Sequence, residues 1–210
     1  MTHHRDSPRR ARGIYAAVAL VLAFGAGKAH GVSYVGLGGG ATPAYRTRII
    51  SYYPTEPETL RVHTGYGFEA QFGWEAAPWV DIEGALRYHI LTSGDSAAYV
   101  LTTPTGHDIV GFEGGVRFHP RRGVTNSIPY VRLGLGSYSP TVKLNEGLDN
   151  LSTDPVLGYY AGIGYVYEVT SVWGIDLRAS AVVYNAFNEA EHGIRLHAAL
   201  VAVTLSVIIF

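Results

Sequence analysis

Eight segments of the chain alternate apolar and polar residues with a period of two, and this pattern constrains the fold more than any other feature. Around Glu83, for example, Asp81 and Arg87 share one face. Ile82 and Leu86 share the other. Successive side chains of a β-strand point to opposite faces, so the alternation predicts strands. The predicted strands are residues 32–42, 65–76, 79–91, 108–119, 128–138, 156–169, 172–184 and 194–210.

The connections between the predicted strands alternate in length. Short connections follow every second strand, and the longer ones between them are mostly rich in Pro, Ser, Thr, Asn or Gly. Short turns at one end and long loops at the other, around an even number of antiparallel strands, predict an all-β, eight-stranded antiparallel up-and-down barrel. The short connections are residues 76–78, 120–127 and 170–171, and the long ones are residues 43–64, 92–107, 139–155 and 185–193.

The amino terminus has the order of a secretory signal peptide. Arg9 and Arg10 precede the apolar run Ile14–Phe24, and small residues follow as far as Ala29. The apolar run is shorter than the roughly 20 residues that a membrane-spanning helix needs. We therefore predict a signal peptide at residues 1–29 and a single barrel domain at residues 30–210.

The amino-acid composition limits the classes of protein to which the chain can belong. The chain has no cysteine, so an exported domain must be stable without disulfides. Without residues 1–29 it carries eleven basic and sixteen acidic residues, a formal charge of −5. A nucleic-acid partner is not expected, because no basic stripe is left to neutralise phosphates. No apolar run is long enough for a membrane-spanning helix.

A soluble secreted barrel would show the same alternation with its polar face in water. Two features oppose that alternative. Beyond residue 29 the chain has one lysine, Lys143, in the predicted loop 139–155, whereas solvated surfaces carry lysine freely. The polar faces are also rich in glycine, which suits the narrow interior of an eight-stranded barrel. These glycines are Gly65, Gly67, Gly73, Gly111, Gly115, Gly134, Gly136, Gly158, Gly162 and Gly164.

Large aromatic residues gather beside the short connections. Aromatic girdles form where a barrel wall passes from lipid to water, because one edge of the ring is apolar and the other polar. The sequence therefore predicts a transmembrane β-barrel, with the apolar face in lipid and the charged face in the lumen. The girdle residues are Trp74, Trp79, Phe118, Tyr167 and Trp173.

Three stretches, "FEAQFGWEAAPWVDIEGALRYH", "IPYVRLGLGSY" and "LGYYAGIGYVYEVTSVWGIDLRASAVVY", carry a family resemblance together with the terminal Phe210. With them, residues 30–210 resemble the OmpA/OmpX-type outer-membrane β-barrel domain of Gram-negative bacteria. The resemblance implies a monomer in the cell outer membrane, surrounded by outer-membrane lipid and lipopolysaccharide. It also implies the barrel-assembly machinery as a partner during biogenesis.

In such families the terminal aromatic residue belongs to the signal that the assembly machinery reads, which implies this role for Phe210. Ile208 fits that signal, but Ser206 and Thr204 share its face. The neighbouring face, residues 201–209, is more apolar. A bulge in the last strand would exchange the two faces, and without one the signal is weak.

The predicted lumen face balances acids with arginines, which suit bidentate pairing with carboxylates. One interpretation is a structural, salt-bridged plug, and the other is a gated polar conduit. We expect Arg87 and Arg117 to pair with Glu69, Glu83 or Glu113. The predicted ion network comprises Glu69, Glu83, Arg87, Glu113, Arg117, Arg132, Asp176 and Arg178, and the same face carries Gln71, Glu75, Asp81, His89, His119, Glu168, Arg195 and His197.

Catalytic and metal sites have little support. The spacing of Asp81 and Glu83 follows from strand alternation alone, and the His-x-Ser pair of lipid A deacylases occurs nowhere in the chain. His89, His119 and His197 could meet in the lumen, but buried histidines are more often simply hydrogen-bonded. We expect no enzyme activity, no cofactor and no metal.

Specific contacts are expected in the loops. The longest predicted loop, residues 43–64, combines tyrosine with arginine, two residue types enriched at binding hot spots. It is the candidate contact surface for an extracellular ligand, with an ordinary exposed loop as the alternative. The candidate residues are Tyr45, Arg46, Arg48, Tyr52, Tyr53 and Arg61.

The sequence thus favours a small outer-membrane barrel with a side-chain-filled polar lumen and a role in envelope integrity or surface contact. A narrow pore for small solutes, of the OmpW-like sort, is the first alternative. A lipid A- or phospholipid-modifying enzyme is the second, and a soluble secreted barrel is the third.

Overall fold

The computed structural model describes residues 32–51, 59–93, 106–120, 126–143, 151–152, 154–188 and 194–210. The predicted signal peptide lies outside these residues. Every regular element in the described ranges is a β-strand. The strands are β1 (Val32–Ser51), β2 (Thr59–Ala77), β3 (Val80–Ser93), β4 (Gly106–Phe118), β5 (Ser127–Lys143), β6 (Leu151–Ser152), β7 (Val156–Glu168), β8 (Trp173–Asn188) and β9 (Ile194–Ile209).

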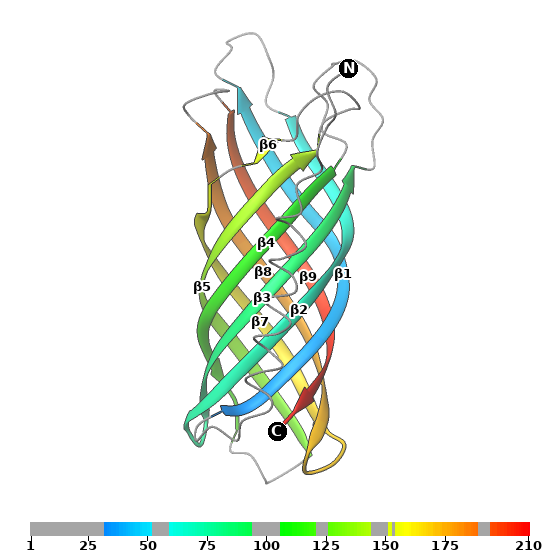
Figure 1. The fold of residues 1–210 in the computed structure, drawn as a ribbon, viewed down its shortest axis with the longest axis vertical. Helices are drawn as coiled ribbons and strands as arrows, with labels where there is room; N and C mark the ends of the chain where they lie inside the picture. The colour runs from blue at the N-terminus through cyan, green and yellow to red at the C-terminus, as the bar shows by residue number, and fades with distance from the viewer. Residues whose placement is uncertain are drawn as a thin grey trace, which may run out of the picture.

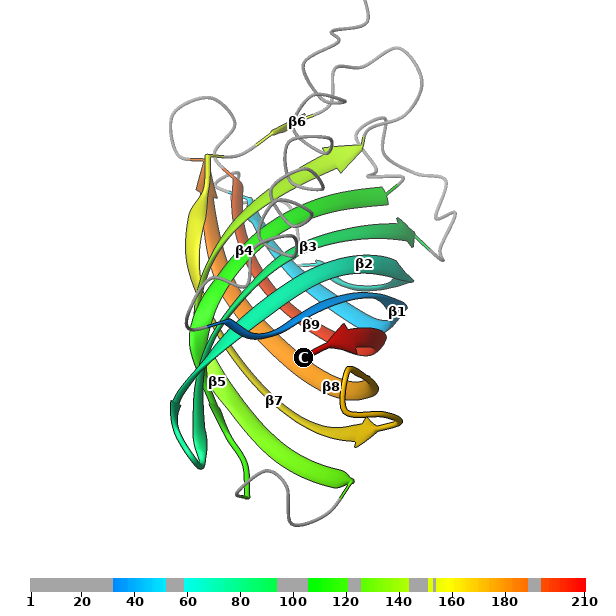
Figure 2. The ribbon, with the colours of Figure 1, turned by 60° about the horizontal axis from the view of Figure 1, so that its bottom comes forward.

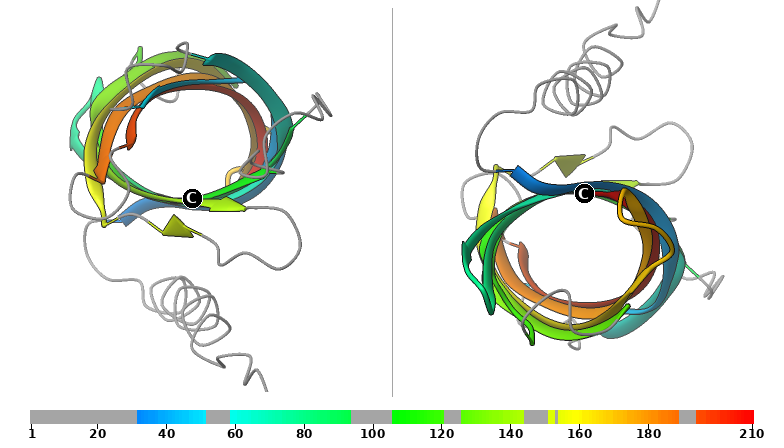
Figure 3. Two further views of the ribbon diagram at one scale, coloured as in Figure 1. Left: turned by 90° about the horizontal axis from the view of Figure 1, so that it is seen from above. Right: turned by 90° about the horizontal axis from the view of Figure 1, so that it is seen from below.

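Eight of the strands form one closed antiparallel sheet. Their order is β4-β3-β2-β1-β9-β8-β7-β5, and pairing of β4 with β5 completes the ring (Figure 1; Figure 3). The two-residue β6 pairs only with the end of β5, at Thr141 and Val142. The predicted eight-stranded antiparallel barrel is therefore confirmed.

The two ends of the barrel differ. β1 begins and β9 ends at the same end, where Figure 2 shows the last residues of β9 between β1 and β8. β2 also runs into β3, β4 into β5 and β7 into β8 at this end, which we call the turn end. The opposite end, where β1 runs into β2 and β3 into β4, is the loop end.

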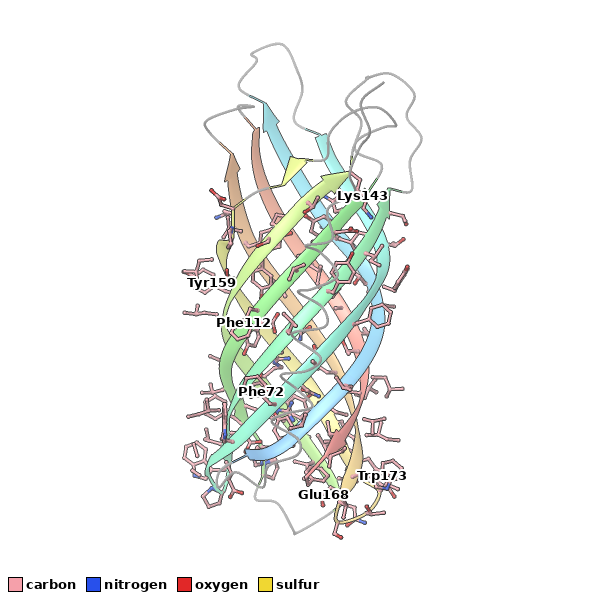
Figure 4. The ribbon with its side chains drawn as sticks, viewed as in Figure 1. Phe72, Phe112, Lys143, Tyr159, Glu168 and Trp173 are labelled. Carbon is pink, nitrogen blue, oxygen red and sulfur yellow. The ribbon has the colours of Figure 1, made fainter. Side chains whose placement is uncertain are left out.

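The barrel has inverted polarity, with charges inside and apolar side chains outside. Glu113, Arg132 and Asp176 have no exposed surface, whereas Ile163 is 64% and Tyr159 is 65% exposed. Figure 4 shows Tyr159 projecting away from the wall. A soluble barrel would bury its apolar face, so these exposures confirm the predicted assignment of the two faces. In the described part of the chain, no helix is long and apolar enough to cross a membrane.

Aromatic rings lie on the outer wall near the turn end, as the girdle prediction requires. Trp79 stacks on Phe118 with 6.2 Å between ring centroids, and Tyr167 and Trp173 are also exposed. Trp173 lies at the opposite end of the barrel from Lys143 (Figure 4). The apolar outer wall therefore ends in aromatic residues at the turn end.

Strands extend further than predicted at the loop end. β1 continues to Ser51, and β2 already begins at Thr59, so most of the predicted loop 43–64 is strand. The alternation of β1 is interrupted at a β-bulge, where the register shifts between Thr42 and Tyr45 against β2, and the predicted strand ended there. A bulge adds one residue and inverts the alternation, and Pro43 tolerates that position because it has no N–H to donate.

The last strand contains no such irregularity. β9 pairs with β8 without a register shift, from Ile209 opposite Trp173 to Ile194 opposite Asn188. From Ala198 onward its even-numbered residues, among them Thr204, Ser206 and Ile208, are consequently buried, and its odd-numbered apolar residues are exposed. The bulge that would exchange the faces of β9 is absent.

We expect an arginine on the outer wall to cost stability according to its depth. Leu135→Arg, in the middle of β5, should destabilise the barrel by about 2–4 kcal/mol, because it places a charge in hydrocarbon. Val172→Arg, in the connection at the turn end, should cost less than about 1 kcal/mol. Urea unfolding in lipid vesicles measures both values. Equal costs at the two depths would contradict a lipid-facing wall.

Candidate functional site in the barrel lumen

A ring of charged and polar side chains crosses the middle of the lumen. Five strands, β2, β3, β4, β5 and β8, contribute its members, and none of them is more than 5% exposed. We call this set the ion-pair ring. Its members are Glu69, Gln71, Glu83, Arg87, Glu113, Arg117, Arg132, Asp176 and Arg178.

Half of the ring alternates arginines with glutamates on β3, β4 and β5. Glu83 forms an ion pair with Arg132 Nε at 2.6 Å and accepts a hydrogen bond from Arg117 Nε at 3.2 Å. Arg132 Nη2 lies 3.1 Å from Glu113, whose same carboxylate oxygen is 3.3 Å from Arg87 Nε. Each arginine in this half therefore bonds to at least one acid from a neighbouring strand.

Glu69 and Gln71 on β2 continue the ring. Glu69 forms an ion pair with Arg87 Nε at 2.8 Å and a second ion pair with Arg178. Arg178 Nη1 also donates to Gln71 Oε1 at 2.9 Å. One acid on β2 is thus shared by an arginine from the adjacent strand β3 and one from β8.

Asp176 on β8 closes the ring across the lumen. It accepts from Gln71 Nε2 at 3.0 Å and from Arg117 Nη2 at 3.4 Å. β8 is separated from β2 by β1 and β9, and from β4 by β5 and β7. These bonds therefore fasten opposite walls of the barrel to each other.

The ring is electrically balanced, with four guanidinium groups against four carboxylates. Charges buried away from water cost several kcal/mol each unless they are paired and hydrogen-bonded. Every charged member of the ring has at least one ion-pair partner, and Glu69, Glu83, Arg87, Glu113, Arg117 and Arg132 each have two. Removing a single member would leave one charge uncompensated, which is the expensive outcome for a buried network.

Four tyrosines surround the ring and donate to its acids. Tyr130 donates to Asp176 at 2.6 Å, and Tyr138 donates to Glu113 at 2.8 Å. Tyr160 and Tyr34 make longer bonds to Glu83, at 3.3 and 3.4 Å. Arginine also stacks on their rings, an attraction between cation and π-face. Arg117 lies over Tyr34 and Tyr130, and Arg132 lies over Tyr160.

Glycines make room for these tyrosine rings. A Cβ atom at Gly164 would collide with the ring of Tyr130, and one at Gly73 would collide with the ring of Tyr34. The sequence predicted that these glycines face the lumen, but the lumen position of the tyrosines was not predicted. The alternation could have predicted it, because Tyr130 lies two residues before the predicted lumen residue Arg132 and therefore shares its face.

Apolar and aromatic clusters lie on both sides of the ring. The described residues also enclose two small cavities of about 10 Å³ each, roughly the space of one water molecule. Side chains therefore fill the lumen around the ring in the part of the chain that the structure describes. The turn-end cluster is Tyr34, Ile128, Tyr130, Val166 and Ile208, and the loop-end cluster is Tyr45, Leu91, Ile109, Tyr138, Tyr160, Val182, Tyr184, Ala198, Leu200 and Ala202.

The lumen histidines are engaged separately. His89 Nδ1 lies 3.0 Å from Thr42 Oγ1, and His119 Nε2 lies 3.3 Å from a carboxylate oxygen of Asp81. His119 Nδ1 is also 2.8 Å from the carbonyl oxygen of Pro120. Within the described ranges, no group of three potential metal ligands is brought together.

The structure brings all eight residues of the predicted ion network into the ion-pair ring, together with Gln71. Some other residues predicted on the lumen face are less buried than the ring. Glu75 is exposed near the turn end, and Glu168 is half-buried at the end of β7. Arg195 and His197 lie in β9, and their side chains are outside the described set.

The candidate contact loop is corrected by the structure. Tyr45 has no exposed surface and shares a hydrogen bond of 3.0 Å with Tyr184 inside the lumen. Arg46 is exposed on the outer wall. Arg48 and Arg61 belong to β1 and β2 rather than to a loop, and Tyr52 and Tyr53 lie outside the described residues. Strand alternation places Tyr45 and Arg46 on opposite faces of the wall.

Phe210, the implied assembly signal, directly follows β9. Its N–H donates to the carbonyl oxygen of Val172 at 2.9 Å. Its ring is partly buried and packs against the turn-end cluster. The terminal aromatic residue thus takes part in closing the lumen at the turn end.

No family model and no curated protein sequence matches the chain. Its structure is similar to that of Neisserial surface protein A, with a TM-score of 0.52 and 13% identity over 85% of this chain and 99% of that one. OprG from Pseudomonas aeruginosa gives a TM-score of 0.54 and 11% identity, over 85% and 97% of the two chains. The outer membrane enzyme PagL gives a TM-score of 0.43 and 11% identity, over 80% and 97%.

Identities this low show a shared fold alone. The chain has the closed eight-stranded antiparallel barrel that solved outer-membrane proteins such as Neisserial surface protein A and OprG possess. One barrel fold can host unrelated functions, so its function has to be argued from the lumen and the walls.

We expect Arg87 and Glu69 to be energetically coupled. Arg87→Met alone should cost about 3–5 kcal/mol, because it leaves the ring with one uncompensated carboxylate. Combining it with Glu69→Leu restores the charge balance and should cost much less than the sum of the single changes. A double-mutant cycle on urea unfolding in vesicles measures the coupling. Arg87→Met combined with Leu135→Ala on the outer wall should be additive, and additivity in both cycles would argue against the ring.

Two glycines on opposite faces provide a matched test of lumen packing. Gly164→Ala should destabilise the barrel by about 1–3 kcal/mol, because its methyl group would displace the ring of Tyr130. Gly114→Ala, on the outer wall, meets no atom within 4 Å and should be nearly neutral. Thermal unfolding in detergent compares the two variants, and similar losses would refute the close contact at Gly164.

Proposed function

We propose that the chain is a small, monomeric outer-membrane β-barrel protein of the OmpA/OmpX type. In this proposal it is exported to the cell outer membrane and surrounded there by outer-membrane lipid and lipopolysaccharide. Its lumen is closed, and the protein contributes to envelope integrity or to surface contact without catalysis.

The closed ion-pair ring is the observation that carries this proposal. Its members bridge opposite walls, from Asp176 on β8 to Gln71 on β2 and Arg117 on β4. A conduit would need these bonds to part and the aromatic clusters on both sides to move. The barrel is therefore best explained as a rigid, filled cylinder, which supports a structural role.

The described side chains also favour a role without catalysis. A nucleophilic mechanism needs a nucleophile, a base and an orienting acid in contact and open to substrate. His89 and His119 are both less than 8% exposed, and their described partners are Thr42, Asp81 and Pro120. Neither offers an exposed base beside a serine or cysteine nucleophile.

Planar-bilayer recording tests the closed lumen. We expect purified wild-type protein to give no steady conductance, because side chains fill the lumen on both sides of the ring. Replacing the lumen tyrosines Tyr138 and Tyr160 together with alanine should raise the conductance. The same change at Tyr159 and Tyr165, on the outer wall, should leave it unchanged. Steady open-channel currents from the wild type would favour the narrow pore instead.

Cell fractionation tests the location independently. The folded protein is expected in the outer-membrane fraction and should migrate differently in unheated and heated detergent gels, because closed barrels resist detergent until they are boiled. Recovery in the soluble fraction would reject the outer-membrane proposal. Mass spectrometry of lipids after expression would detect lipid modification, which would reject the proposal of no catalysis.

A further inference from the structure

A small cavity lies beside the ion-pair ring, at the place where the first and last strands close the barrel. β1 and β9 pair there and lie side by side in Figure 1. The cavity has a volume of about 10 Å³, and residues of β1, β2, β3 and β9 line it. This volume is roughly the space of one water molecule. We call it the seam cavity.

No described side chain of β1 or β9 belongs to the ion-pair ring. These two strands lie between β2 and β8, which both carry ring members. The positions of β1 that face the lumen beside the ring are glycines, Gly38 and Gly40. They pair with Ser206 and Thr204 of β9. The ring therefore faces an uncharged part of the wall at the seam.

Close backbone packing prevents the wall from filling the seam cavity with a side chain. A Cβ atom at Gly40 would overlap the carbonyl oxygen of Val203 on β9, and one at Gly67 would lie 2.6 Å from His89 Nδ1. Both glycines line the cavity, as does Ala202. A larger residue at either glycine would push β9 or His89 away, so small residues preserve the space.

Four polar side chains line the seam cavity, and none of them is more than 7% exposed. Glu69 and Arg87 are ring members whose ion pair is 2.8 Å long. His89 is the next lumen-facing residue of β3 after Arg87, and Thr204 contributes a hydroxyl group from β9. A buried cavity of this size with about two to four polar partners can hold a water molecule, whereas apolar cavities stay dry.

The charges around the seam cavity favour a neutral occupant. A metal ion would lie against the guanidinium group of Arg87, and an anion would lie against the carboxylate of Glu69. The ring already balances four positive and four negative groups, so an ion of either sign would leave one charge uncompensated. A water molecule can accept from Arg87 and donate to Glu69 at the same time.

We propose that one ordered water molecule occupies the seam cavity and links the ion-pair ring to Thr204 of β9. It extends the hydrogen-bonded layer of the lumen to the part of the wall that carries no ring member. Water that bridges two polar groups is nearly as favourable as a direct hydrogen bond. The site depends on the lumen alone and requires neither the proposed location nor the proposed role of the protein.

Crystallography of the full barrel from a lipidic mesophase, at a resolution that shows ordered solvent, tests the site. In the wild type we expect one electron-density peak within hydrogen-bonding distance of Thr204 Oγ1 and of Glu69 or Arg87. Thr204→Val keeps the shape of the side chain but removes its hydroxyl group, so the refined occupancy of the peak should fall by about half or more. Ala202→Val adds methyl groups beside the cavity and should remove the peak.

Two controls make the experiment specific. Ser206 lies two residues from Thr204 on the same buried face of β9 but is not among the residues that line the cavity. Ser206→Ala should therefore leave the peak unchanged. Wild-type crystals grown with bromide, and others grown with manganese, should show no anomalous signal at the peak. Heat-modifiability on gels shows that each variant is folded.

Three results would overturn the proposal. These are no peak in a wild-type map that shows other ordered solvent, an unchanged peak in both Thr204→Val and Ala202→Val, and an anomalous signal that identifies an ion in the cavity. The first and the third use the wild type, so misfolding of a variant cannot hide them. Fractionation and conductance test the location and the closed lumen separately. A failed water site therefore remains distinguishable from a failed proposed function.

Discussion

Burial of four arginines with four carboxylates inside a narrow lumen is the interaction on which the rest of the barrel depends. Eight strands enclose little more space than side chains need, so the described partners of these charges are one another, Gln71, Ser180 and four tyrosines. Because a buried charge without a partner is expensive, the ring constrains the residues around it. Glycines such as Gly73 and Gly164 are needed where tyrosine rings must fit between the wall and the arginines.

The ion-pair ring also connects strands that are not neighbours in the sheet. β8 bonds to β2 and β4 through Asp176, across the lumen rather than through the sheet. Opposite walls are consequently held by charge pairs, while neighbouring strands are held by backbone hydrogen bonds. The charged side chains are thus paired inside the barrel, and the described outer wall is largely apolar.

The alternation of residues along each strand made the lumen face largely predictable from the sequence. The contacts that it did not predict were missed for physical reasons. Alternation assigned Glu83, Arg87 and Arg117 to one face, because the period of two is fixed by backbone geometry. It did not show that Asp176 would meet Gln71, since contacts across a lumen depend on the stagger of all the strands between them. The tyrosines were missed because they were treated as apolar, although the hydroxyl of Tyr130 is a donor that an acid can use.

The bulge in β1 shows how one irregularity can determine two properties of the barrel. Before it, even-numbered residues such as Thr42 face the lumen, and after it Tyr45 faces the lumen and Arg46 faces outward. Without the extra residue, Arg46 would enter the loop-end cluster and Tyr45 would lie on the wall. A charge would then be buried among apolar side chains, away from the acids of the ring. The same inserted residue therefore places the aromatic side chain of Tyr45 in the lumen and the charge of Arg46 on the outer wall.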